Sequence, residues 1–362
     1  MAKEDFKILS ARDHVRMRTG MYLGSTSKET VERFIMGKWQ KVEYVPALNK
    51  MVDEIIDNAI DEAIRTNFEY ANQISVSVKG EEFTITDNGR GIPQEEVTDS
   101  DGNKMLRPVA AWTKTNAGTS FDDNRTTIGA NGVGSACTNF MSKKFTGLTW
   151  QNGQAVKVAA VNGSEGVKVT TTKKDGSGTS VSFIPDYSLL AIESQSDVHT
   201  LELIEDRLTS LQIAFPEIKF KFNGRRVNAS NIKRYAQLFL EDDSASVVAS
   251  TNDNCSYFFT TSVDGFRTTS YINGVNTRLG GTYVDYVVNG VCDELVTMVK
   301  RKHKIEVAKS TIKNGLTFVL FARNFVDPKY DSQTKERLTS NITSVKEHYD
   351  GDGFDKIARK IM

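Results

Sequence analysis

Two polar side chains one turn apart stand out on a segment that the sequence predicts to be a helix. In residues 51–65 apolar residues recur in doublets every four positions, a spacing that gives an α-helix one broad buried face. Glu54 and Asn58 lie on the other side, and Asp61 continues their line along the helix. The segment therefore offers a carboxylate beside an amide, although an amphipathic helix with a solvated acidic face has the same pattern.

A second carboxylate, Asp87, ends the second of two predicted strands. Residues 74–78 and 82–87 alternate between apolar and polar types, which places Asp87 on the apolar side. A carboxylate there needs a hydrogen-bond donor. The following Asn88–Pro93 contains two glycines that allow the backbone to approach a flat or bulky ligand, although Asn-Gly is also the usual signal of a hairpin turn.

A glycine cluster at residues 129–134 precedes a helix predicted over residues 135–141. Glycine-rich turns that open into a helix present free N–H groups, which commonly hold phosphate. The cluster lacks the Lys-Ser/Thr pair of a P-loop, and it also lacks the preceding strand and the ribose-binding acid of a dinucleotide fold. By itself it is weak evidence for a phosphate site.

Composition limits the class of protein. A chain of 362 residues predicts two domains, because single cores stop growing near roughly 250 residues. The 46 basic and 46 acidic residues cancel, so any nucleic acid must be met by a local patch. The three cysteines are widely spaced and predict neither a disulfide framework nor a zinc site. Without a long apolar stretch or a signal core, we expect a soluble cytoplasmic protein without a membrane partner.

The remaining elements follow from periodicity. Residues 1–25 predict a loose arm that ends in a hairpin or docking point at Gly20–Gly24, and a short apolar-periodic segment and a turn at Gly37 follow. Pro46 suits the start of the central helix. The pattern further predicts helices over 197–215, 228–240 and 281–301, strands over 218–222, 255–261, 268–272 and 317–323, and a domain boundary near residue 225. The continuous apolar run of the last strand predicts burial on both faces.

Taken in order, these motifs resemble the ATPase fold shared by gyrase, the ninety-kilodalton heat-shock chaperones, histidine kinases and mismatch-repair proteins. Within that superfamily the chain is most similar to type IIA DNA topoisomerases. The segments that carry the resemblance are VDEIIDNAIDEA (52–63), DNGRGIP (87–93), GANGVG (129–134), GTSVSF (178–183), YINGVNT (271–277), GGTYVD (280–285) and DSQTKE (331–336).

The resemblance implies an α+β fold. Residues 1–225 are expected to form a two-layer α/β sandwich that binds ATP and carries an N-terminal dimerisation arm. Residues 226–362 are expected to form a transducer domain, with the fold of the second domain of a small-subunit ribosomal protein.

The resemblance also implies residue roles, with ATP and Mg²⁺ as cofactors. Glu54 would activate the water that attacks the γ-phosphate, Asn58 would bind Mg²⁺, and Asp87 would accept a hydrogen bond from adenine. The other implied contacts are Thr179 beside Asp87, Gly91 and Ile92 against the base, Thr119 and Ser120 near the ribose and phosphates, and Asn131, Gly132, Val133 and Gly134 as a phosphate lid. The roles of Asp57 and Asp61 stay open between supporting groups and solvated ones.

Two basic features lie in the second half of the chain. Lys335, with Gln333 beside it, resembles the family's lysine that reaches across the domain boundary to the γ-phosphate, although the three letters alone favour a solvated lysine on a loop. The run Lys300, Arg301, Lys302 and Lys304 coincides with a loop that faces DNA in eukaryotic members. A solvated cap favoured by the helix dipole is the alternative.

The function expected from the resemblance is an ATP-operated gate. ATP binding would close a homodimer, with the arm around Met21 and Tyr22 crossing to the partner, and the dimer would trap a DNA duplex. The chain lacks a recognisable cleavage region, so other domains or subunits of a topoisomerase would cut the DNA. Alternatives are a mismatch-repair or chaperone type clamp and a nucleotide-sensing dimerisation module without useful turnover. Signatures of bacterial and eukaryotic type occur together, which fits a bacteriophage enzyme.

Overall fold

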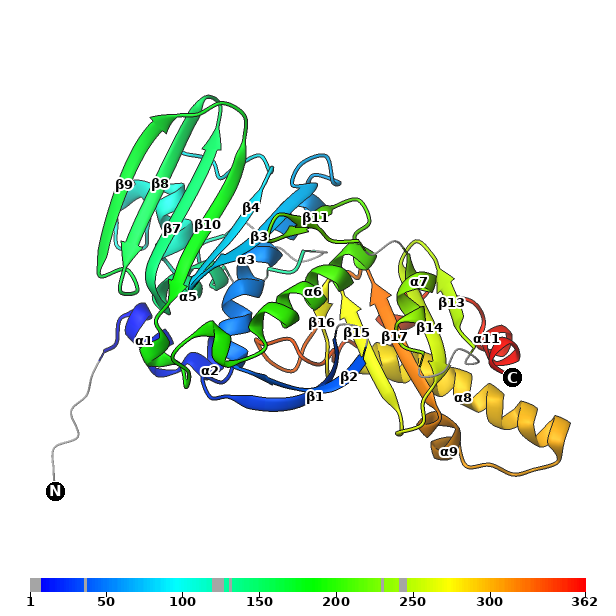
Figure 1. Ribbon diagram of the computed structural model, residues 1–362. Helices are drawn as coiled ribbons and strands as arrows, with labels where there is room; N and C mark the ends of the chain where they lie inside the picture. The colour runs from blue at the N-terminus through cyan, green and yellow to red at the C-terminus, as the bar shows by residue number, and fades with distance from the viewer. Residues whose placement is uncertain (1–7, 36–37, 119–126, 130–131, 229–230, 241–245) are drawn as a thin grey trace, which may run out of the picture.

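Two β-sheets with helices packed on them form the molecule (Figure 1). The computed structural model describes residues 8–35, 38–118, 127–129, 132–228, 231–240 and 246–362. Within these residues the larger sheet has eight strands and the smaller has five, and two further two-stranded sheets lie beside them. The α+β class and the sandwich architecture predicted from the sequence are confirmed.

The eight-stranded sheet runs in the order β12-β11-β3-β4-β10-β7-β8-β9. Its pairs are antiparallel except for the parallel pair of β11 with β3. The outermost strand, β9, is exposed on both faces and extends beyond the helices (Figure 1). The strands are β3 (Gln73–Lys79), β4 (Glu82–Asp87), β7 (Ser142–Gln151), β8 (Gln154–Val161), β9 (Gly166–Lys173), β10 (Gly178–Pro185), β11 (Lys219–Phe222) and β12 (Arg225–Arg226).

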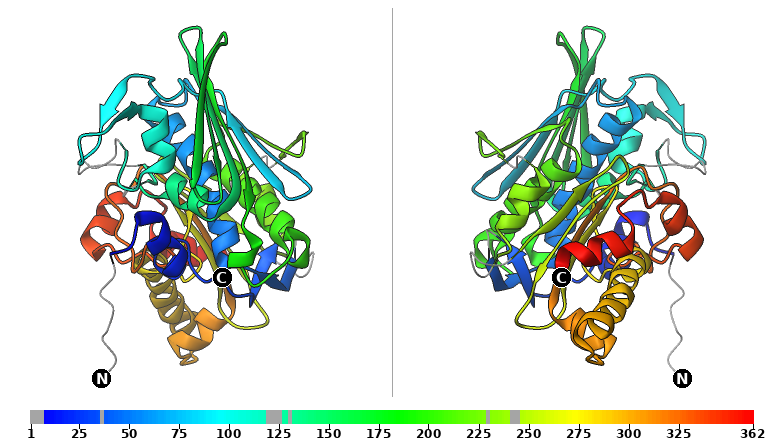
Figure 2. Two further views of the ribbon diagram at one scale, coloured as in Figure 1. Left: turned by 90° about the vertical axis from the view of Figure 1, so that its left-hand side faces the viewer. Right: turned by 90° about the vertical axis from the view of Figure 1, so that its right-hand side faces the viewer.

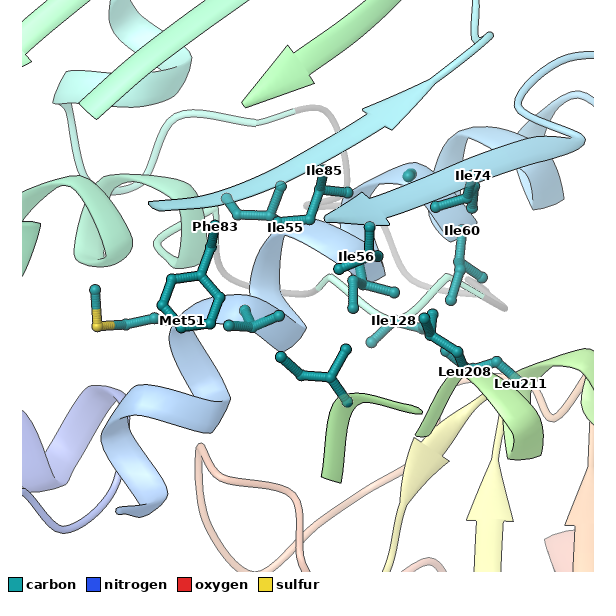
Figure 3. Packing of buried hydrophobic residues seen from close by; sticks show 14 of the residues in the cluster. Met51, Ile55, Ile56, Ile60, Ile74, Phe83, Ile85, Ile128, Leu208 and Leu211 are labelled. Atoms are coloured by element: carbon teal, nitrogen blue, oxygen red, sulfur yellow. The ribbon is translucent and has the colours of Figure 1, made fainter. Parts of the chain in front are cut away.

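The predicted central helix is α3, Pro46–Arg65, and it begins at the proline as expected. Its apolar stripe is buried against β4 and against α6 (Thr200–Ala214), as Figure 3 shows for Met51, Ile55 and Ile56. Two more helices, α4 (Arg107–Thr113) and α5 (Gly134–Phe140), complete the layer that covers the sheet (Figure 2). Because this apolar stripe is buried, the opposite, polar face of α3 is held in a fixed position relative to the end of β4.

The five-stranded sheet runs in the order β13-β14-β17-β15-β16. A long helix, α8 (Thr282–His303), joins the parallel strands β15 and β17 and packs on one face of the sheet. The strands are β13 (Val248–Thr251), β14 (Cys255–Thr261), β15 (Arg267–Ile272), β16 (Val275–Asn276) and β17 (Leu316–Ala322). Further helices here are α7 (Ile232–Gln237), α9 (Lys309–Asn314), α10 (Ile342–His348) and α11 (Phe354–Ile361).

The central strand β17 is buried at all seven positions, which confirms the burial predicted on both faces. Phe318 and Leu320 face the cluster around α8. Val319 and Phe321 face a second cluster that continues into the core of the eight-stranded sheet through Leu211 of α6. The two sheets therefore share a hydrophobic core, and a domain boundary near residue 225 stays a prediction.

The N-terminal segment differs from the sequence expectation. Instead of a hairpin at Gly20–Gly24, the described residues form two short helices, α1 (Ala11–Met17) and α2 (Thr19–Tyr22). Ser10 caps the first by accepting a hydrogen bond from the Asp13 N–H, and the Thr19 hydroxyl bonds back to the Val15 carbonyl. These local bonds favour helix over hairpin. The segment after it is a hairpin of β1 (Glu29–Ile35) and β2 (Lys38–Tyr44).

Two predicted helices are shorter than expected because local hydrogen bonds set their starts. The helix predicted over 197–215 begins at Thr200, since Asp197 instead accepts hydrogen bonds from the Glu193 and Ser194 N–H groups in a preceding turn. The helix predicted over 228–240 is α7, Ile232–Gln237, whose start is capped by Asn231. Of the helices in the described part of the chain, none is long and apolar enough to cross a membrane.

Candidate functional site

A cavity of about 230 Å³ opens between α3, the end of β4, α5 and the loop that carries Lys335. It continues past Gly91 and Ile92 into a wider opening of about 1140 Å³. Eleven of the predicted site residues line the smaller cavity, namely Glu54, Asn58, Asp87, Gly91, Ile92, Gly132, Val133, Gly134, Thr179, Gln333 and Lys335. Thr119, Ser120 and Asn131 lie outside the described residues.

Glu54 is held in its charged form by cations. Its side chain is 13% exposed, and the Lys50 ammonium lies 2.7 Å from its Oε1. Burial by itself would raise the pKa of Glu54, but the charges of Lys50 and then Lys335 outweigh burial and leave the pKa below its usual value. An ionised carboxylate at the cavity wall can accept a proton.

The amide of Asn58 lies one turn along α3. Its Nδ2 donates a hydrogen bond to the Ser135 hydroxyl of α5 at 2.7 Å, which fixes the orientation of the amide and turns Oδ1 away from that contact. An amide oxygen is a suitable ligand for Mg²⁺, which usually keeps several waters and substrate phosphate oxygens. The residues therefore fit a magnesium ion held by one protein oxygen and a bound phosphate chain.

Asp87 ends β4 and pairs across the sheet with Thr179 of β10. Its Oδ1 accepts a hydrogen bond of 2.7 Å from the Gly89 N–H. Burial raises the pKa of Asp87 to about 6, and the Gly89 bond opposes that rise. At neutral pH the group is a carboxylate that can accept a further hydrogen bond, such as that of an exocyclic amine.

Two of the predicted lid glycines are required by close packing. A Cβ on Gly134 would overlap the carboxylate of Glu54. Gly132 has φ +60°, and a Cβ there would lie 2.8 Å from the Ala117 carbonyl oxygen. These glycines let the backbone pass close to the reacting end of the cavity, as a phosphate cradle requires.

Lys335 is buried beside the same cavity, so the alternative of a solvated loop lysine is wrong. Its Nζ donates a hydrogen bond of 2.8 Å to the Ile128 carbonyl, on a segment more than 200 positions earlier in the chain. Burial and the nearby Lys50 charge lower the pKa of Lys335, while Glu54 opposes the change. A cation from the loop that follows the five-stranded sheet thus reaches the wall of the cavity, together with Gln333.

The two aspartates left open by the sequence are buried supports. Asp61 accepts hydrogen bonds from the Ile128 and Gly129 N–H groups, at 2.5 and 2.7 Å. Burial raises the pKa of Asp61 to about 6 against these two bonds. Asp57 forms an ion pair with Arg207 of α6. Neither aspartate is a solvated group on an acidic face.

Sequence reasoning missed the residues that hold these groups in place. Lys50 had a usable signal, because it lies four residues before Glu54 on the same helix. Arg207 pairs with Asp53 and Asp57 from a helix about 150 positions later, which no local pattern could reveal. Thr149 is fully buried beside Asp87's strand partner and looks like any strand threonine in the sequence.

The predicted arm and basic run also have defined positions. Tyr22 is hydrogen-bonded to His14 of the same chain at 2.9 Å, whereas the Met21 side chain is 63% exposed. The basic run ends α8, where Lys304 is the left-handed cap and the run is exposed. Lys300 pairs with Glu306 at 2.7 Å.

Comparison with family models gives two matches along the chain. Residues 44–189 match the model described as "Histidine kinase-, DNA gyrase B-, and HSP90-like ATPase". Residues 227–357 match the model described as "DNA gyrase B".

Two solved structures have the same fold. The ATPase region of Saccharomyces cerevisiae topoisomerase II superimposes with a TM-score of 0.88 at 24% identity, over 99% of this chain and 96% of that one. The ATPase and transducer domains of DNA topoisomerase II from Balamuthia mandrillaris superimpose with a TM-score of 0.87 at 26% identity, over 98% of this chain and 94% of that one.

Curated relatives extend the comparison to sequence. The DNA topoisomerase large subunit of Enterobacteria phage T4 is 42% identical over 364 residues, which covers 100% of this chain and 69% of the relative. Human DNA topoisomerase 2-beta is 28% identical over 347 residues, and the chain spans 21% of its length. The chain therefore belongs to the type II DNA topoisomerase family and corresponds to its ATPase and transducer region.

Proposed function

We propose that the cavity beside α3 binds ATP with Mg²⁺ and hydrolyses it to operate a DNA-capturing gate. The observation that carries the proposal is the convergence of Glu54, Asn58 and Lys335 on one glycine-walled cavity. A carboxylate, an amide oxygen and a cation at one wall are the groups that phosphoryl transfer to water needs. Asp87 and Thr179, at the other end, supply polar groups for a base.

Each residue has a defined task in this proposal. Glu54 accepts a proton from the attacking water, and the Lys50 charge keeps Glu54 ionised for that step. Lys335 stabilises negative charge on the transferring phosphoryl group. Asn58 supplies the protein ligand of Mg²⁺, which neutralises charge on the phosphates when bound. Asp87 and Thr179 hold the adenine amino group, with Gly91 and Ile92 against the ring.

Lys335 also couples the site to the transducer region. In the structure its ammonium donates to the Ile128 carbonyl, close to Glu54. A γ-phosphate offers a stronger, charged acceptor, so the lysine transfers from the carbonyl to the phosphate when ATP binds. The loop of Gln333 and Lys335 then moves with the nucleotide state.

Dimerisation and DNA contact complete the proposed gate. ATP binding closes a homodimer in which the N-terminal arm contacts the partner. Of the two arm residues Met21 and Tyr22, Met21 has the exposed side chain that is available for this contact. The basic run of Lys300, Arg301, Lys302 and Lys304 contacts the DNA backbone without sequence preference, and salt weakens the contact. Other topoisomerase domains or subunits supply cleavage, and the assembly works in the cytoplasm of the cell that holds the DNA.

The proposal is tested by replacing Glu54. Glu54→Gln keeps the shape of the side chain but removes the proton acceptor, so ATP turnover should fall at least about 100-fold while the Kd for ADP stays within about threefold. Turnover is measured by phosphate release and binding by calorimetry, with Glu69→Gln, an exposed glutamate after the same helix, as the control. Turnover equal to that of the control would reject Glu54 as the base.

The role of the dimer is tested separately. A gate enzyme should show a specific ATPase rate that rises with protein concentration as dimers form, whereas a sensing module without useful turnover should show a negligible rate throughout. Measuring the rate over a wide concentration range, with sedimentation to report the dimer fraction, separates the two.

A further inference from the structure

Two side chains of β7 form hydrogen bonds with the backbone of one residue, Ile92, in the loop that follows Asp87. The Ile92 N–H donates a hydrogen bond of 2.7 Å to the Thr149 hydroxyl oxygen. The Ile92 carbonyl accepts one of 3.1 Å from the Gln151 amide. Thr149 and Gln151 are two positions apart, so both side chains leave β7 on the same side.

The Thr149 hydroxyl also contacts the strand that carries Thr179. As a donor it bonds to the Gly178 carbonyl at 3.3 Å, and the Thr179 hydroxyl lies 3.5 Å away. Thr149 is fully buried, so neither bond competes with water. One hydroxyl therefore fixes the distance between the loop of Ile92 and the start of β10.

We propose that Thr149 and Gln151 are positioning residues for the nucleotide base. They act through Ile92 and Thr179, which line the same cavity as Asp87. The inference rests on the proposed ATP site and adds to it the feature that sets the width of the slot for adenine. The phosphate end of the cavity, with Glu54 and Gly134, lies on other elements and should not depend on these bonds.

Thr149→Val tests the proposal because it keeps the shape and removes the hydroxyl. The Ile92 N–H then loses its acceptor and the loop shifts to find another, so the Kd for ADP should rise about tenfold, as expected for one buried hydrogen bond. Thr149→Ser keeps the hydroxyl and should stay within about twofold of the wild type. Thr146→Val, on the opposite side of the same strand, controls for the substitution itself.

Two readouts distinguish positioning from a purely structural role. Positioning predicts that KM for ATP rises about tenfold with kcat unchanged, because Glu54 and Lys335 are untouched, whereas partial unfolding lowers kcat at constant KM. Inorganic tripolyphosphate, used as a competitor without a base, should inhibit Thr149→Val and the wild type equally. If tripolyphosphate also binds about tenfold more weakly to the variant, the defect is not at the base and the proposal is wrong.

Gln151 provides a second variant with a more accessible side chain. Gln151→Met removes the amide and should raise KM for ATP several-fold, again with kcat and tripolyphosphate inhibition unchanged. Wild-type affinity for ADP in both Thr149→Val and Gln151→Met would overturn the inference and leave the ATP site intact. A wild-type protein that binds neither ATP nor ADP would overturn the proposed function and this inference together.

Discussion

Three buried carboxylates in this protein differ in what balances their charge. Glu54 has Lys50 and Lys335 close by and stays ionised. Asp87 has backbone N–H donors, and its pKa rises to about 6. Asp206 of α6 is 8% exposed and has no hydrogen bond or ion pair among the described residues, and burial raises its pKa to about 7. Their environments thus separate a carboxylate that stays ionised at neutral pH, Glu54, from two carboxyl groups that are protonated more readily.

Asp87 predicts a pH dependence of nucleotide binding. Below a pKa of about 6 the carboxyl is protonated and loses its capacity to accept a hydrogen bond from adenine, so affinity for ADP should fall as the pH drops. Between pH 8 and pH 5.5 the Kd should rise about fourfold, the factor by which the ionised fraction falls. Calorimetry across this range measures it, and Asp87→Asn should show a flat profile. An equally flat profile in the wild type would contradict the assignment.

The raised pKa of Asp206 predicts that ionisation of this carboxyl group destabilises the folded protein at high pH. Its pKa is higher in the folded protein than in the unfolded chain, so the folded state holds the proton more tightly. The contribution of Asp206 to the free energy of unfolding should therefore decrease as the pH rises from about 4 to about 7 and stay constant above that range. Asp206→Asn should add on the order of 4 kcal/mol at pH 8, from a shift of about three pKa units, and almost nothing at pH 4.

Urea unfolding of the wild type and the variant at the two pH values measures this penalty. Glu205→Asn, at the neighbouring, more exposed position of the same helix, is the control. Equal gains at both pH values would show that the charge of Asp206 is not the cause.

At the scale of elements, the loop after β4 depends on a glycine with φ +79°. A Cβ on Gly91 would lie 2.5 Å from the Trp150 carbonyl oxygen, a backbone atom that cannot move aside. Gly153, in the turn between β7 and β8, has φ +78°, and no atom lies within 4 Å of the position that a Cβ would occupy. Alanine substitutions at Gly91 and Gly153 therefore separate the free-energy cost of a positive φ from that of the close contact with the Trp150 carbonyl.

Gly91→Ala should therefore destabilise the protein and weaken ADP binding at least about tenfold, because the loop must leave β7. Gly153→Ala should cost only about 1 kcal/mol of stability and leave binding unchanged. Thermal unfolding and calorimetry measure the two effects. Similar losses of ADP affinity in both variants would argue against a role for the close approach.

Elements with a clear apolar pattern could be predicted from the sequence, whereas helix ends and segments without such a pattern could not. The apolar doublets of α3 and the continuous apolar run of β17 match the positions that are buried in the structure, so the residue types alone indicate these elements. The start of α7 is set by one capping hydrogen bond, which Asn231 accepts from the Arg234 N–H. The segment after α1 begins with a bond that the Thr19 hydroxyl donates to the Val15 carbonyl. Such single bonds leave no repeating signal, so the predictions there were wrong.

The residues of the candidate site also include some that could be predicted from the sequence and some that could not. Motif residues such as Glu54, Asn58 and Asp87 could be predicted because the order of their motifs resembles that of a known family, and they do line one cavity. Thr149 and Arg207 could not, because their importance comes from contacts between segments far apart in the chain. Arg207 pairs with Asp53 and Asp57 of α3, and Thr149 bonds to Ile92, so both contact neighbours of the motif residues.

At the scale of the whole molecule, Lys335 links the region of the smaller sheet to the cavity. We expect Lys335→Ala to lower ATP turnover at least about tenfold, since a cation at the transferring phosphoryl group is lost. The variant should also lose the change in small-angle scattering that a non-hydrolysable ATP analogue produces in the wild type. Lys329→Ala is the control, because Lys329 lies in the same loop with a 63% exposed side chain.

A scattering change in Lys335→Ala as large as in the wild type would assign the coupling to another contact. Retained turnover in the same variant would remove Lys335 from the chemistry as well. The two measurements are independent, so either role can fail alone.

The burial of β17 on both faces has a consequence for how the two regions can move. An internal strand paired on both sides, with all seven side chains buried, should have amide hydrogens that exchange with deuterium only on global unfolding. We therefore expect β17 to keep its pairing during turnover, and the loop of Lys335, which reaches the cavity, to change position between nucleotide states more readily than this strand.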